Sequence, residues 1–265
     1  DTSVPEEALP QSRATGPFVP DYMPRRDERF PLRENYEFPP HIVVHIPETP
    51  VDEVTLALMC KRALEMDVPE YMAYMIMAAE GKLPWNFYHD LCRQLWDECR
   101  HAMMGTVYFE KHGIDWKKQI ALHPGFAITA NVLMTPLEAH AALYYIEQGL
   151  MRGTFGGKKS EYERAVMAHD DLAALFQDYD WADEVLHVHI GRKWGVERSG
   201  LPRDEFIRLG DESFRRAFAE FGIQFPQPEK QTDWWTPFVT AVLGHPPTSA
   251  AGVEQTQAWA RIGSG

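Results

Sequence analysis

The sequence lacks the features that mark several large classes of protein. Only three of its 265 residues are cysteines, an odd number that lies within helical patterns, so no disulfide framework is indicated. No apolar run reaches the roughly 18 residues that cross a bilayer, and the first residues hold no basic segment followed by an apolar stretch. We therefore expect a soluble, cytoplasmic protein without a membrane partner.

Basic residues are also fewer than acidic ones. The chain has 26 Lys and Arg against 39 Asp and Glu, which gives a formal net charge of −13. Nucleic-acid backbones and anionic membranes both attract a basic surface, so neither is expected as the main partner. A small molecule or another protein is expected instead.

The chain divides into three regions by composition. Residues 1–50 are rich in proline and charge and show no helical or strand period, which indicates an extended arm. Such an arm wraps its own body or a neighbouring subunit, as in a homodimer. Residues 51–222 carry apolar residues at helical spacing, and 223–265 read as an irregular tail whose aromatic cluster T-D-W-W-T-P-F docks on the body.

The helical region predicts an all-α fold, most simply a four-helix bundle with an additional C-terminal helix and an extended N-terminal arm. Gly and Pro in G-K-L-P at 81–84 mark a helix stop and restart. No strand is expected. The expected helices cover about 50–80, 84–112, 125–150, 171–194 and 200–222.

One short pattern occurs twice in this region. The stretches W-D-E-C-R-H at 96–101 and W-A-D-E-V-L-H at 181–187 both contain Asp-Glu-x-x-His. Positions i and i+3 share one face of a helix, so Glu98 with His101, and Glu184 with His187, can each direct a carboxylate and an imidazole to one point. Two such pairs on facing helices, with one Glu from each of two further helices, make the ligand set of a carboxylate-bridged di-iron site.

The glutamate of the first helix is sought opposite Glu98 in an antiparallel hairpin. Reflection across the G-K-L-P turn falls close to Glu70, which lies within an apolar face that includes Met66 and Tyr74. Glu65 is about 140° away from Glu70 by the 100° step of a helix, so Glu70 is the expected ligand.

The third helix offers two glutamates on opposite faces, Glu138 and Glu147. The Glu147 face is the more apolar one, with Leu143 and Leu150 among its residues, so Glu147 is favoured and Glu138 remains the alternative. Burial of each large apolar side chain contributes about 1.5–3 kcal/mol and should set the orientation of the helix.

The aspartates of the two patterns have an expected role as well. A metal-bound imidazole usually donates its other N–H to a carboxylate, which fixes its orientation. Asp97 and Asp183 lie too far round their own helices to reach their own histidines. We therefore expect crosswise pairs, Asp97 with His187 and Asp183 with His101.

These residues resemble those of the ferritin-like superfamily of di-iron carboxylate proteins. The stretches P-W-N-F-Y-H-D-L-C-R-Q-L-W-D-E-C-R-H and Y-Y-I-E-Q-G-L are similar to a poorly characterised ferritin-like family, distantly related to tRNA-modifying di-iron hydroxylases. The resemblance covers roughly 55–195. It implies a bundle whose ligands are Glu70, Glu98, His101, Glu147, Glu184 and His187, and an oxygen-activating or iron-oxidising function.

The sequence therefore predicts an O2-dependent oxidoreductase with two Fe ions that oxidises a small organic substrate. The same ligands suit a Mn/Fe pair. A ferroxidase or iron-storage protein is the alternative. Because the chain has no glycine-rich nucleotide motif and no pair of C-x-x-C elements, we expect an external electron donor, a ferredoxin or a reductase.

Overall fold

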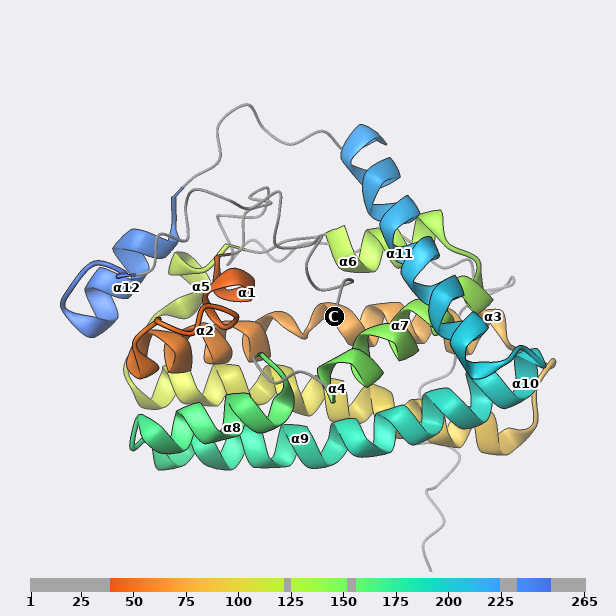
Figure 1. The fold of residues 1–265 in the computed structure, drawn as a ribbon, viewed down its shortest axis with the longest axis horizontal. Coiled ribbons are helices and arrows are strands. Elements are labelled where there is room, and N and C mark those ends of the chain that lie inside the picture. Colours follow the sequence, from red (N-terminus) through yellow and green to blue (C-terminus); the bar gives the residue numbers. More distant parts are fainter. Residues whose placement is uncertain (1–38, 122–124, 152–155, 225–232, 249–265) are drawn as a thin grey trace, which may run out of the picture.

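The computed structural model describes residues 39–121, 125–151, 156–224 and 233–248 (Figure 1). All regular secondary structure in these ranges is helical, as the sequence predicts. No helix among them is both long enough and apolar enough to pass through a bilayer. The elements are α1 (Pro40–Val43), α2 (Val51–Leu64), α3 (Asp67–Ala78), α4 (Trp85–Lys111), α5 (Trp116–Gln119), α6 (Gly125–Leu133), α7 (Pro136–Leu150), α8 (Lys158–Met167), α9 (Asp171–Gly191), the π-helix η2 (Arg192–Val196), α10 (Glu197–Ser199), α11 (Arg203–Gln224) and α12 (Trp235–Leu243).

Four helical rods form the body of the molecule (Figure 1). Two of them are the single helices α4 and α9, which lie side by side. The third rod is α2 followed by α3, which packs on α4, and the fourth is α7 followed by α8, which packs on α9. Contacts of Asp97 with His187 and of His101 with Asp183 fix α4 and α9 as antiparallel neighbours.

The third rod is interrupted where the sequence predicts one helix over about 50–80. Helix α2 ends at Leu64 and α3 begins at Asp67. Pro69 lies in the first turn of α3, the part of a helix where a missing backbone N–H is tolerated. The helical phase of α2 therefore does not continue into α3.

The helix predicted over 125–150 is also divided, into α6 and α7. Thr135 caps α7 by accepting a hydrogen bond from the backbone of Glu138, whose side chain in turn accepts from the Thr135 backbone. Pro136 follows at the first helical position, where its fixed φ favours a helix start. The motif T-P-L-E at 135–138 therefore marks the start of a second helix inside the range predicted as one helix. Helix α8 lies between the ranges given for the third and fourth predicted helices.

Apolar clusters fill both ends of the four rods. At one end α2, the last turns of α4, and α12 bury side chains that include Leu58, Phe109 and Phe238. At the other end α3, the first turns of α4, and α7 bury side chains that include Met72, Leu91 and Leu143. Each large apolar side chain so buried contributes about 1.5–3 kcal/mol. Between the two clusters, at the level of the predicted site, the interior is polar.

The regions outside the predicted bundle are partly described. In the expected arm, residues 39–50 contain the short helix α1, and Val43 and Val44 join the first apolar cluster. In the expected irregular tail, residues 235–243 form helix α12, so this part is regular. The buried rings of Trp234 and Trp235 place it against the body. Residues 1–38 of the expected arm, and 225–232 and 249–265 of the expected tail, lie outside the described residues.

Candidate metal centre

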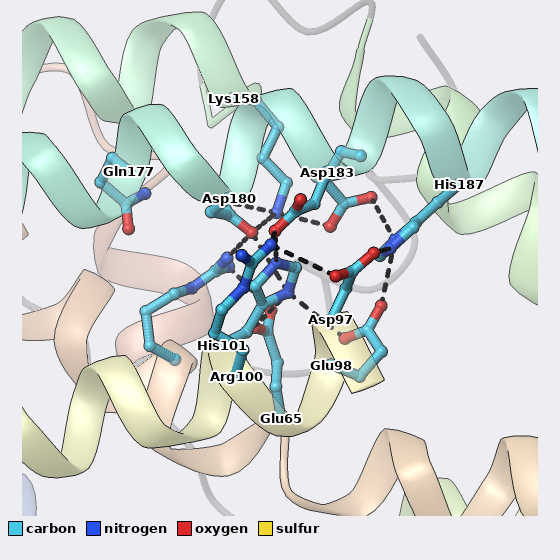
Figure 2. Close-up of polar contacts among 12 residues, drawn as sticks. Glu65, Asp97, Glu98, Arg100, His101, Lys158, Gln177, Asp180, Asp183 and His187 are labelled. Atoms are coloured by element: carbon cyan, nitrogen blue, oxygen red, sulfur yellow. Dashed lines mark hydrogen bonds and ion pairs between the residues drawn. The ribbon is translucent and has the colours of Figure 1, made fainter. Parts of the chain in front are cut away.

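Two Glu-x-x-His pairs face each other in the polar layer. Figure 2 shows Glu98 and His101 of one pair opposite His187 of the other. Glu98 and His101 come from the middle of α4, and Glu184 and His187 from the second half of α9. Both histidines are fully buried, and both glutamates are only 3% exposed. The two continuous helices thus direct the repeated pattern inward at one level.

Three overlapping groups of side chains in this layer could each hold a metal ion, with their ligand atoms within 4.8 Å of one another. Glu98 belongs to two of the groups, and so does Glu184. A carboxylate has two oxygens and can therefore serve two neighbouring cations. The groups are Glu98–Glu184–His187, Glu65–Glu98–His101 and His101–Asp180–Glu184.

Glu147, the favoured glutamate of the predicted third helix, lies next to the first group. One of its oxygens accepts a hydrogen bond from Gln94 Nε2 at 2.5 Å and lies 3.7 Å from His187 Nδ1. The alternative, Glu138, completes the capping box of α7 and lies 2.9 Å from Arg216. Only Glu147 is brought to the cluster.

Glu70 is not brought to the cluster, and the expectation for this residue requires correction. It is exposed on α3. Glu65 lies there instead, with one oxygen 3.5 Å from His101 Nδ1. The prediction counted one helical phase through both residues, whereas Glu65 is the residue that ends α2 and Glu70 belongs to the next helix.

The two aspartates lie across from the histidines as expected. Asp183 is 3.1 Å from His101 Nε2, and Asp97 is 3.5 Å from His187 Nε2. Arg93 holds both oxygens of Asp97 at 3.0 Å, and Arg100 contacts Asp97 and Asp183 together. Each imidazole is therefore oriented so that Nε2 faces an aspartate and Nδ1 faces the glutamates.

Sequence reasoning missed three residues of the cluster, Arg62, Lys158 and Asp180. Asp180 is fully buried on α9 and precedes Glu184 by one turn, so the i, i+4 spacing could have revealed it. Lys158 and Arg62 are each 1% exposed, and both contact Asp180. No local signal marked these two cations, because α8 and the end of α2 meet α9 only in the folded chain.

The environment favours the protonated form of both histidines. Burial by itself lowers the pKa of His101, but the charge of Asp180 and hydrogen bonds with Asp183 and Glu98 raise it to about 10. The pKa of His187 is likewise raised well above its ordinary value, because Asp97 and the glutamates outweigh the effect of burial. In the metal-free protein the two imidazolium groups are therefore cations that partly neutralise the acids.

The pKa values of the carboxyl groups shift in opposite directions. Burial raises the pKa of Glu147 well above its ordinary value and that of Glu65 to about 7, although Arg62 and Lys158 oppose the rise at Glu65. For Glu98 burial acts the same way, but hydrogen bonds from His101 and His187 prevail and hold the pKa well below its usual range. Protons are thus retained by the metal-free cluster near neutral pH.

The donor atoms of the cluster fit a divalent metal ion. In the described part of the chain, several of its buried polar atoms have no contact with good hydrogen-bond geometry: Nδ1 of His101, both ring nitrogens of His187, and one oxygen each of Glu65, Glu147 and Glu184. A buried polar atom without a partner costs about 1–3 kcal/mol. Imidazole nitrogen and carboxylate oxygen together suit iron, manganese and zinc.

Searches against models of known protein families, curated proteins and solved structures found no match for this chain.

Proposed function

We propose that this protein is a ferritin-like di-iron oxidase or oxygenase that uses dioxygen to oxidise a small organic substrate. The observation that carries the proposal is the convergence of two Glu-x-x-His pairs whose Nδ1 atoms face shared carboxylates. Arg62 and Lys158 compensate part of the buried negative charge, but one oxygen each of Glu65, Glu147 and Glu184 stays without a hydrogen-bond partner, which is costly unless a metal binds there.

The arrangement of the rods supports the ferritin-like part of the proposal. Since α4 and the α7–α8 rod are both antiparallel to α9, they run parallel to each other and need a long crossover between them. The chain supplies one over 112–135, which includes α5 and α6. One long crossover connection is typical of ferritin-like bundles.

Six side chains would hold the two ions. On one side these are His187 and Glu147, and on the other His101 and Glu65, with Glu98 and Glu184 each close to both histidines. When bound, an iron pair supplies electrons and open coordination positions for the reduction of dioxygen. Manganese in one position fits the same donors.

Other residues of the chain would orient the imidazole ligands and keep bulk water away from the metal ions. Asp97 and Asp183 fix the two imidazoles in the orientation that leaves Nδ1 free for metal, and Arg93 and Arg100 fix the two aspartates. The apolar clusters above and below the layer exclude bulk water from it. An external ferredoxin or reductase would supply electrons for repeated turnover.

The proposal is tested by single turnover. Protein loaded anaerobically with ferrous iron is mixed with ¹⁸O-labelled dioxygen and a pool of small metabolites, and the products are analysed by mass spectrometry. We expect labelled oxygen in one organic compound, or loss of hydrogen from it, and no such product with Glu98→Ala. Oxidation of iron without any organic product would instead support the ferroxidase alternative. Failure to consume dioxygen would contradict both functions.

A further inference from the structure

Lys158 is a buried cation inside the candidate metal centre. It is the first residue of α8 and is 1% exposed. Its Nζ lies 2.8 Å and 2.9 Å from the two oxygens of Asp180 and 2.8 Å from Glu184 Oε1 (Figure 2). All three contacts are within hydrogen-bond range, which matches the three N–H donors of an ammonium group.

The two carboxylates that Lys158 contacts are also potential metal ligands. Asp180 and Glu184 form, with His101, one of the three groups able to hold a metal ion. The ammonium therefore uses carboxylate oxygens of the same residues that a metal on the His101 side would use. A divalent ion bound there would also lie close to a positive charge, and the repulsion would weaken its binding.

Arg62 adds a second positive charge on the same side. Its guanidinium pairs with Asp180 and lies 2.7 Å from Glu65. On the His187 side Glu147 is held by the neutral amide of Gln94, and Lys158 reaches that side only through Glu184. The charges surrounding the two histidines are therefore unequal, although the sequence patterns that contain them are alike.

We propose that Lys158 acts as a built-in cation that holds Asp180 and Glu184 together in the metal-free protein and competes with the metal ion on the His101 side. The His187 side then fills first, and the second ion binds more weakly because the ammonium must give up its contacts with Asp180 and Glu184. This inference rests on the proposed function, since it assigns an order of loading to the same two positions.

The test is an anaerobic titration of the full-length metal-free protein with ferrous iron, and in parallel with Mn²⁺ alone, with bound metal measured after each addition. We expect two binding steps in the unmodified protein. In Lys158→Met the second step should strengthen at least about fivefold, the lower range for coupling between interacting sites. The first step should change less, because most ligands of the His187 side do not contact Lys158.

The melting temperature of the metal-free protein gives a second readout that does not depend on activity. Loss of one partner from a buried ion pair leaves the other charge uncompensated, so Lys158→Met should melt on the order of 10 °C lower without metal. Metal should restore more stability to this variant than to the unmodified protein. Lys158→Arg, which keeps the charge, should keep the weak second step.

Lys61→Met is the matched control. Lys61 is also a buried lysine, but it pairs with Glu161 at 2.5 Å, and Glu161 belongs to none of the groups able to hold metal. This variant should lose stability without any gain in metal affinity.

If Lys158→Met does not fold, the metal titration of the unmodified protein still tests the inference. Two ions bound with equal affinity would contradict competition by Lys158 while leaving the metal centre intact. An equal gain in Lys61→Met would contradict it as well. Absence of bound metal from both the unmodified protein and Lys158→Met would contradict the proposed function itself.

Discussion

The two sides of the candidate metal centre come from the same short pattern but differ in their surroundings. Around His187 lie Glu98, Glu147 and Glu184, with Gln94 as a neutral hydrogen-bond donor. Around His101 lie Glu65, Glu98 and Asp180, and the cations Arg62 and Lys158 contact these acids. The repeat in the sequence therefore makes two sites of similar ligands and unequal charge.

The difference arises from the two interrupted rods. Glu65 lies at the end of α2, where that rod breaks, and Lys158 lies at the start of α8, where the other rod resumes. Both breaks are close to the His101 side. The continuous helices α4 and α9 supply what the two sides share, and the breaks supply what distinguishes them.

The largest effect is expected from removal of a carboxylate that both sides use. Glu98 lies 3.2 Å from His187 Nδ1 and 3.5 Å from His101 Nδ1, so Glu98→Ala should weaken binding on both sides. We expect a loss of more than roughly 100-fold in affinity, above the range for residues behind the ligands. Glu161→Gln, another buried acid, should lose stability and keep its metal. Retention of two ions by Glu98→Ala would refute the shared role.

A change confined to the His101 side should separate the two sides. Glu65→Gln removes a ligand there, so we expect about one ion to remain bound, on the His187 side. Glu70→Gln is the control, since Glu70 is exposed on α3. If Glu70→Gln lost metal and Glu65→Gln did not, the assignment of Glu65 as the ligand at the break between α2 and α3 would be wrong.

The equivalent change on the His187 side is Glu147→Gln. It should leave at most the weakly bound ion on the His101 side. Glu138→Ala is its control and should cost only the capping box of α7, typically about 1 kcal/mol, with metal content unchanged. Calorimetry for stability and elemental analysis for metal separate the two outcomes. Loss of metal from Glu138→Ala alone would reverse the assignment.

Smaller effects are expected from the aspartates behind the histidines. Asp97→Asn and Asp183→Asn keep the size of each side chain but weaken the hold on one imidazole, so affinity should fall roughly 10–100-fold. Asp97→Asn should affect the His187 side, and Asp183→Asn the His101 side. Stepwise metal titration distinguishes the two sides, and parental affinity in both variants would contradict the crosswise pairs.

Taken per proton, the effect of pH is the smallest. Metal ligands must be neutral imidazoles and ionised carboxylates. In the metal-free protein His101, with a pKa of about 10, and Glu65, with a pKa of about 7, hold protons at pH 6 that the metal must displace. Affinity should therefore rise with pH, roughly tenfold from pH 6 to 7 for each proton displaced. A flat profile, or a fall, would contradict these proton positions.

The parts of the site that could be predicted are those carried by uninterrupted helices. Within α4 and α9 the spacing of Glu98, His101, Glu184 and His187 fixes their common direction, and the same register explains the crosswise aspartates. Glu147 could be chosen over Glu138 because the apolar face of α7 settles its orientation. Each of these inferences needs only one continuous helical phase.

The parts that could not be predicted depend on breaks and on distant partners. The choice of Glu70 over Glu65 is wrong because it assumes one helical phase across the junction of α2 and α3, where Pro69 in the first turn of α3 marks a new helix. Lys158 lies on a helix with no strong apolar period, and its partners are on α9. Contacts between separate rods cannot be inferred from the spacing of residues within one helix.

Metal content tests the proposed di-metal centre most directly. Protein freed of metal, reconstituted anaerobically with ferrous iron and passed through a desalting column, should retain about two iron ions per chain by elemental analysis. Glu98→Ala treated in the same way gives the background. Iron at the level of that background, with manganese also at trace level after parallel reconstitution, would contradict the assignment of this buried cluster as a metal centre.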